Sequence, residues 1–149
     1  MKQIITIILF SCSWLFSVGQ EKEDSLANAL SSLVLSQATE VAVGGDVGTP
    51  SEVIAFNMIY RSPLAGQKFK DIYLRSSIAG KFYCLIGLYL IKDTEYEKYK
   101  TEFLSLKTDK GISFRAGCMR FKYDKGELLN KWIEGFSSKV WYTEALIIK

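Results

Sequence analysis

Histidine is absent from the 149 residues of the chain. Its imidazole is the side chain that most often serves as a general base near neutral pH and as a ligand of transition metals. Without it, this chain cannot build a Ser-His-Asp triad, a Cys-His nucleophile or a histidine-bearing zinc site. Acid–base catalysis by this chain would therefore have to depend on carboxylates.

An excess of charge of one sign is also missing. The chain has 19 Lys and Arg against 16 Asp and Glu, and leaving out Lys2 of the N-terminal segment gives 18 against 16. This near balance gives no reason to expect a polyanionic partner, so nucleic acid is not expected. The segment from Lys107 to Lys125 is locally basic, and we interpret it as a solvated edge of the domain.

The N-terminus has the three regions of a secretory signal peptide. Lys2 supplies the positive charge, residues 4–10 form an apolar run, and Ser17 and Gly19 are small residues just before the charged stretch 21–24. This pattern predicts cleavage after Gly19 and export, either to the periplasm or as a secreted protein. A membrane anchor needs roughly 20 apolar residues, whereas serines interrupt this run.

Cys12 offers an alternative route of processing. Residues 9–12, Leu-Phe-Ser-Cys, resemble a loose bacterial lipobox, in which the cysteine is lipidated and becomes the first mature residue. Phe10 is bulky for its position, and apolar residues continue to Phe16, which makes an odd start for a lipoprotein tether. In this alternative the chain is a lipid-anchored accessory protein, and it meets a membrane only if it is lipidated.

Residues 20–149 are expected to form a single helical domain of the usual size. Apolar residues at three- and four-residue spacing predict a mainly α fold, either an antiparallel helical bundle or a short HEAT-like helix stack. A minor strand pair or a bulge is expected near Phe114–Tyr123, with a helix start as the alternative, and the apolar tail 136–149 is expected to pack back onto the domain. The expected helices are 24–35, 51–60, 64–75, 79–91, 94–106 and 127–133, the last ending at Gly135.

The stretch 79–91 is the most hydrophobic part of the expected domain. A helix that is apolar on nearly every side belongs at the centre of a fold, and this one is too short to span a bilayer. Gly80 and Gly87 lie seven residues apart on roughly one face, so a neighbouring element can approach closely there.

Thr49 to Glu52 has the pattern of a capping box at the start of a helix. Thr49 is the expected N-cap, Pro50 the first helical residue, and Glu52 the residue that reaches back to the N-cap amide. The preceding residues 37–48 are glycine-rich, and we expect a loop there that can include a brief strand. They lack the Lys-Ser/Thr of a phosphate-binding loop, which favours a plain connector.

Residues 78–89, Ile-Ala-Gly-Lys-Phe-Tyr-Cys-Leu-Ile-Gly-Leu-Tyr, resemble the inner helix of a HEAT-type repeat. The resemblance extends over Thr49–Asp93 and is shared with small exported bacterial proteins of unknown function. It implies helices stacked as antiparallel neighbours. It implies no activity and no site residue.

Cys84 and Cys118 are the cysteines that remain after removal of the signal peptide. An even pair in an exported protein suggests a disulfide, which would stabilise the fold by about 3–4 kcal/mol in the chain-entropy model. The alternatives are two buried free thiols, or a reactive Cys118 whose pKa is lowered by Arg115 and Arg120.

A carboxylate-based hydrolase without histidine is an alternative function, because glycosidases need only two acidic side chains across a cleft. Most of the candidates have structural explanations as helix caps or as exposed side chains. Asp46 lies alone in the glycine-rich loop. The candidates are Asp46, Glu52, Asp71, Asp93 and Glu127.

Aromatic side chains favour a different function. Most fall at core spacing, but Tyr96 and Tyr99, together with Trp141 and Tyr142 of the tail, are predicted to form an interaction surface. The favoured function is a non-catalytic binding or interaction module for an unknown protein or small ligand. No catalytic residue, cofactor-binding residue or metal ligand is expected.

Overall fold

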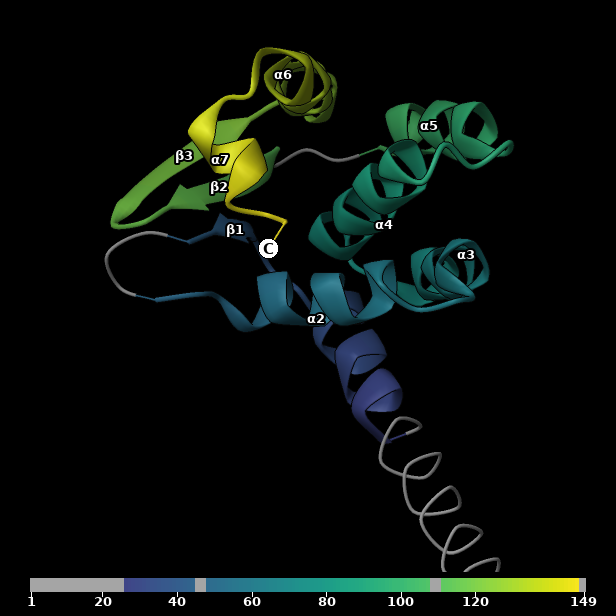
Figure 1. The fold of residues 1–149 in the computed structure, drawn as a ribbon. Coiled ribbons are helices and arrows are strands. Elements are labelled where there is room, and N and C mark those ends of the chain that lie inside the picture. The colour runs from purple at the N-terminus through teal and green to yellow at the C-terminus, as the bar shows by residue number, and fades with distance from the viewer. Residues whose placement is uncertain (1–25, 45–47, 108–110, 148–149) are drawn as a thin grey trace, which may run out of the picture. The chain divides into compact units, whose positions relative to one another are not determined.

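The computed structural model describes residues 26–44, 48–107 and 111–147, and these are mainly helical with a small sheet (Figure 1). The described residues from Ser31 onward belong to one compact unit, which contains the sheet. Within the described ranges, no helix is long and apolar enough to cross a membrane. Besides a helix at residues 26–36, the elements are β1 (Val41–Val43), α2 (Ser51–Tyr60), α3 (Ala65–Arg75), α4 (Ile78–Leu90), α5 (Tyr96–Ser105), β2 (Ile112–Ala116), β3 (Met119–Tyr123), α6 (Lys125–Ser138) and α7 (Trp141–Glu144).

Helix α4 lies at the centre of the core, where its hydrophobicity predicted it. From Ala79 to Leu88 its residues are buried, apart from the half-buried Lys81. It contacts α2, α3, α5, β1 and β2. The Ser77 hydroxyl caps the helix by accepting a hydrogen bond from the Gly80 N–H (3.1 Å). Each large side chain buried here contributes roughly 1.5–3 kcal/mol, which makes α4 the main source of hydrophobic stabilisation.

Two glycines let neighbouring elements come close to α4. A Cβ at Gly87 would lie 2.4 Å from a ring carbon of Phe69 on α3, and a Cβ at Gly80 would lie 2.2 Å from the Leu35 carbonyl oxygen. Both distances are far inside van der Waals contact, so no larger side chain fits without a shift of the neighbour. The predicted close approach at these two positions is confirmed.

The described sheet has the order β1-β2-β3. Strand β1 runs parallel to β2, with Ala42 opposite Arg115, and helices α2 to α5 connect the two. Strands β2 and β3 form an antiparallel hairpin, with Phe114 opposite Phe121. Its turn contains Gly117, whose φ of 59° is costly for other residues. The strand pair predicted near Phe114–Tyr123 is therefore confirmed.

The side chain of Tyr83 joins α4 to the sheet. Its hydroxyl accepts a hydrogen bond from the Ala42 N–H (2.7 Å) and donates one to the Ala42 carbonyl (2.8 Å). Tyr83 is fully buried, and burial raises the pKa of its phenol well above the ordinary value. The hydroxyl therefore stays protonated and satisfies both backbone groups of β1 at this position.

The predicted capping box does not form. Helix α2 spans Ser51–Tyr60 as expected, but its N-cap is Pro50, with a β-like ψ of 147° and no side-chain capping bond, and not Thr49. Glu52 instead accepts a hydrogen bond from the Ser51 hydroxyl (3.2 Å). The extended ψ of Pro50 keeps this residue out of the helix, so Thr49 lies one residue too far back to cap α2.

Helix α6 does not end at Gly135, as was predicted, but continues to Ser138. It ends where Lys139 takes a left-handed conformation with φ of 53°. Gly135 is instead a packing position, because a Cβ there would lie 2.8 Å from the Thr143 methyl carbon. The Thr143 hydroxyl also donates to the Gly135 carbonyl (3.1 Å), so α7 is held against α6.

The C-terminal segment is also held by α2. The side-chain amide of Asn57 donates hydrogen bonds to the carbonyls of Val53 (2.7 Å) and Leu146 (2.6 Å). The Leu146 side chain is fully buried in the core. One polar side chain of α2 thus fixes the position of the chain after α7.

Replacing Tyr83 with phenylalanine should destabilise the protein by about 1–3 kcal/mol, because the Ala42 N–H and C=O would stay buried without a partner. Urea unfolding measures the loss. Tyr89→Phe is the matched control, since it removes a hydroxyl from a half-buried tyrosine on the same helix. Equal stability of the two variants would contradict the role assigned to the Tyr83 hydroxyl.

Candidate binding site

A small pocket lies between the β2–β3 hairpin and helices α6 and α7. Its volume is about 80 Å³, and its walls are aromatic and aliphatic except for one lysine. That volume can hold one small group, such as the end of a side chain, and not a whole drug-sized ligand. The lining residues are Phe114, Tyr123, Leu128, Lys131, Trp132 and Tyr142.

The pocket exists because α6 and α7 cover β2 but leave β3 open. Successive strand residues alternate between faces, and on the core-facing side Phe114 and Ala116 of β2 are buried. Their partners on β3 are Phe121 and Met119, which are 40% and 53% exposed. The same face of the sheet is thus buried on one strand and exposed on the next.

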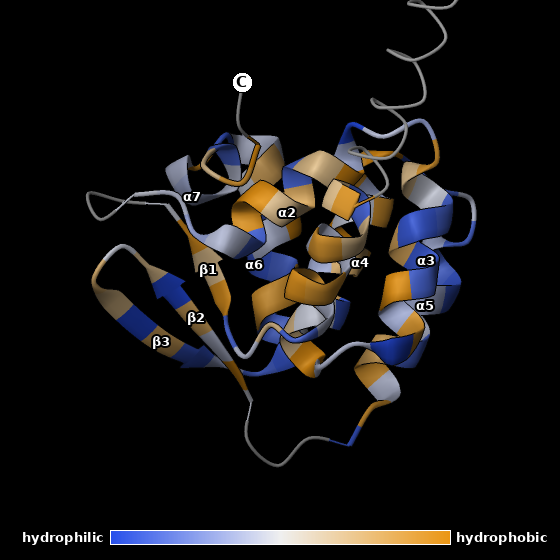
Figure 2. Cartoon of the chain, turned by 90° about the horizontal axis from the view of Figure 1, so that it is seen from below, coloured by the Kyte–Doolittle hydropathy of each residue, from blue (hydrophilic) through white to orange (hydrophobic). Residues whose placement is uncertain are grey.

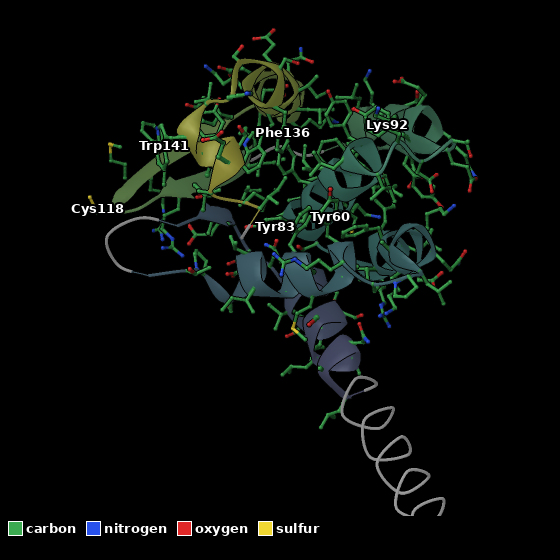
Figure 3. The ribbon with its side chains drawn as sticks, in the orientation of Figure 1. Tyr60, Tyr83, Lys92, Cys118, Phe136 and Trp141 are labelled. Atoms are coloured by element: carbon green, nitrogen blue, oxygen red, sulfur yellow. The ribbon has the colours of Figure 1, made fainter. Side chains whose placement is uncertain are left out.

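The exposed part of this face continues onto α7. Phe114 contacts Phe121 at a ring-centroid distance of 6.3 Å and Tyr142 at 5.8 Å. Tyr142 in turn contacts Trp141, which is 53% exposed. Figure 3 shows Trp141 on the side of the molecule where the hairpin lies. We call Met119, Phe121, Tyr123, Trp141 and Tyr142 the aromatic patch; Tyr123 and Tyr142 also line the pocket.

Two polar groups mark the pocket. Lys131 holds its Nζ 5.5 Å from the centre of the Tyr123 ring, and its carbonyl accepts a hydrogen bond from the Tyr142 hydroxyl (3.3 Å). Trp132 is fully buried, and no acceptor among the described residues bonds its indole N–H. An apolar wall with one cation beside it favours a group that is apolar in part and carries an acceptor or a negative charge.

The opposite face of the hairpin is basic. Glu40 accepts hydrogen bonds from Nε of Arg115 (2.6 Å) and of Arg120 (3.0 Å). Burial raises the pKa of the Glu40 carboxyl, but the hydrogen bonds and charges of the two arginines outweigh it, and the pKa lies below its ordinary value. One carboxylate therefore bridges both strands of the hairpin.

Only part of the predicted interaction surface belongs to this site. Trp141 and Tyr142 do, but Tyr96 and Tyr99 lie on α5. Tyr99 is 7% exposed and packs edge-on against Tyr73 at 4.9 Å. Tyr96 packs against Tyr89 at 5.5 Å, and burial raises the pKa of its phenol to about 12. Tyr99 is a core side chain and Tyr96 is partly buried against the core. Both lie on α5, so they do not belong to the same cluster as Trp141 and Tyr142.

The predicted partners of a disulfide are both free thiols. Cys84 is buried on α4, and burial raises the pKa of its thiol far above the ordinary value. Cys118 is exposed in the turn between β2 and β3, at the tip of the hairpin (Figure 3). The structure places one thiol in the core and the other on the surface.

The candidate carboxylates do not line the pocket. Asp93 forms an ion pair with Lys70 (3.3 Å), and Asp71 accepts from the Gln67 amide (2.8 Å). Glu52 lies on α2 and Glu127 is exposed on α6. Among the described residues, no three His, Cys, Asp or Glu side chains are grouped as a metal ion would need. Asp46 and Cys12 lie outside the described residues.

The site residues on the hairpin and on α6 could not be recognised as site residues from the sequence. Met119, Phe121 and Tyr123 carry a period-two pattern that predicted a strand, and the pattern alone gives an apolar face without telling whether another element covers it. No sequence pattern marked Lys131 as a site residue, because a lysine on an amphipathic helix is usually solvated.

Comparisons with known proteins identify no relative of this chain. No protein-family model matches the chain, and no curated protein or solved structure matches it. The resemblance of Thr49–Asp93 to HEAT-like repeats stays a prediction.

Replacing Glu40 with glutamine should cost about 1–2 kcal/mol at pH 7, because two charged hydrogen bonds are weakened. The pKa of Glu40 is lower in the folded state than in the unfolded state, where it is about 4.5. The stabilisation that the ionised carboxylate gives to the fold is therefore complete above pH 4.5 and is lost as the pH falls through the folded-state pKa. The stability difference between wild type and variant should therefore be smaller at a pH well below 4.5 than at pH 7. Urea unfolding at both pH values measures it.

Glu97→Gln is the control for this measurement. Glu97 also pairs with a lysine, but it is exposed on α5, and surface ion pairs contribute little. A Glu40 variant that lost no more stability than the Glu97 variant at pH 7 would contradict the bridging role of Glu40.

Proposed function

We propose that this chain is a non-catalytic binding module and that the aromatic patch is its binding surface. The observation that carries the proposal is the exposure of Met119 and Phe121 on the core-facing side of the sheet, where such side chains are normally buried. Exposed apolar residues grouped beside a pocket are typical of interaction sites. Aromatic and methionine side chains are enriched in such interfaces.

Another group of exposed apolar side chains is a weaker candidate for the binding surface. Ile54 and Met58, on α2, are 47% and 41% exposed. They are aliphatic, and neither lines the aromatic pocket. The aromatic patch combines rigid rings, a concave pocket and a lysine, which are the features that give binding energy and orientation to an interface.

We propose that the module acts after export. The support for this is the pattern of residues 1–19, which lie outside the described residues. Intact mass of the protein from its native host tests it. A mass starting at Gln20 would support cleavage after Gly19, a mass starting at Cys12 with acyl groups would mean a lipid anchor instead, and an unprocessed chain would contradict export by cleavage.

Selection from a displayed library of random peptides of about eight residues, which is within the usual length of strands, tests the binding function. It is run under reducing conditions because Cys118 is exposed. We expect enriched peptides whose binding is weakened at least about tenfold by Phe121→Ser and by Trp141→Ser, since interface energy concentrates in a few large side chains.

Leu74→Ser is the matched control. Leu74 is 69% exposed on α3, which lies at the other side of the molecule from β3 in Figure 2. Its substitution should leave peptide binding unchanged. Circular dichroism of each variant separates loss of binding from loss of fold. No enrichment over an empty surface, or equal loss in the Leu74 variant, would contradict the proposed function.

A further inference from the structure

The two outer strands of the sheet differ in whether the backbone N–H and C=O groups on their outer edges have hydrogen-bond partners among the described residues. On β1, the N–H and C=O of Ala42 are both bonded by the Tyr83 hydroxyl (2.7 and 2.8 Å). Strand β3 is the other outer strand, and Figures 1 and 2 show no described element on its outer side. A side chain therefore closes one edge of the sheet, and the other edge is open.

The hairpin register shows which backbone groups face the open edge. The two-residue turn makes Ala116 and Met119 a hydrogen-bonded pair. Bonded and non-bonded pairs alternate along an antiparallel ladder, so the N–H and C=O groups of Arg120 and Lys122 point away from β2. No described residue bonds these four backbone groups of β3, so they can bond an added strand.

The side chains of β3 present two different surfaces to such a strand. Phe121 and its neighbours at alternate positions belong to the aromatic patch, whereas Arg120 and Lys122 lie on the opposite face, which also carries Arg115 of β2. The carboxylate of Glu40 bonds both arginines, and Glu52 interacts with Arg115 at longer range. No ion pair of Lys122 occurs within the described part of the chain, and the face keeps an excess of positive charge.

A second copy of this chain fits the edge poorly. Antiparallel pairing of two β3 strands centred on Phe121 would place Arg120 of each copy opposite Lys122 of the other. Like charges directly opposite each other destabilise a sheet. Basic residues on an edge strand are a common protection against such self-pairing. The same charges attract a strand that carries acidic residues at alternate positions.

We propose that β3 binds an extended acidic segment of a partner protein by strand addition. The segment's alternate apolar side chains lie beside Phe121 on the aromatic patch, and its acidic side chains lie beside Arg120 and Lys122. Backbone hydrogen bonds to β3 supply affinity, and the alternation of side chains supplies specificity. This inference rests on the proposed function, because it names the partner of the same surface.

Titration with a fluorescein-labelled peptide of about eight residues that alternates valine and glutamate tests the inference. We expect saturable binding that weakens as salt is raised. Lys122→Glu should weaken it about five- to tenfold, because attraction across the pair becomes repulsion. Methylation of alternate peptide amides on the bonding edge should abolish it, since the backbone donors are then lost.

Two controls accompany the titration. Arg75→Glu makes the same charge change at an exposed residue of α3 and should leave the affinity unchanged. A peptide that alternates valine and lysine should not bind. Binding that survives amide methylation, or that weakens equally in the Arg75 variant, would overturn strand addition at β3.

The two proposals fail in different ways. If the library yields peptides that depend on Phe121 and Trp141 while the valine–glutamate peptide does not bind, the binding function stands and the acidic-strand inference is wrong. If no peptide depends on the aromatic patch, the binding function itself is wrong.

Discussion

The contact on which the rest of the structure depends is the pair of hydrogen bonds between the Tyr83 hydroxyl and Ala42. Tyr83 comes from the middle of α4, the helix that the other helices of the core surround. Together with the buried Val41 and Val43, this side chain joins β1 to the helical core. Strand β1 then orders β2 by parallel pairing, and β2 orders β3 through the hairpin.

The open edge and the aromatic patch follow from this order. Helices α6 and α7 cover β2, because Trp132 of α6 and Tyr142 of α7 both contact Phe114 of β2. The sheet extends one strand beyond that cover. The side chains of Met119 and Phe121 therefore lie on the core-facing side of the sheet but remain exposed to solvent. Exposed apolar side chains grouped in this way are typical of interaction sites.

Much of the fold could be predicted from the sequence, because local patterns determine it. The apolar run of α4, the close approach at Gly80 and Gly87, and the hairpin at 112–123 each depend on residues near one another in the chain. The capping box failed because the backbone preference of Pro50 moved the cap by one residue. The end of α6 was misplaced because Gly135 serves packing against Thr143, a contact that helix signals do not encode.

The candidate site was predicted only at α7. The other residues form a site because the helices leave β3 uncovered. This is a property of the tertiary packing, which the periodicity and spacing of residues in the sequence do not encode. Tyr96 and Tyr99 were predicted at an interface, but Tyr99 lies in the core and Tyr96 packs partly buried against Tyr89. The cysteine count suggested a disulfide, whereas the fold places Cys84 inside and Cys118 at the hairpin tip.

Hydrogen exchange of single backbone amides tests the central claim most directly, because it compares the closed and the open edge in one protein. The account predicts that the Ala42 amide, bonded by Tyr83, exchanges slowly, and that the amides of Arg120 and Lys122 exchange much faster than that of Phe121 between them. If the Arg120 and Lys122 amides were as protected as Phe121 in the free protein, the edge of β3 would already be occupied and the account would be wrong.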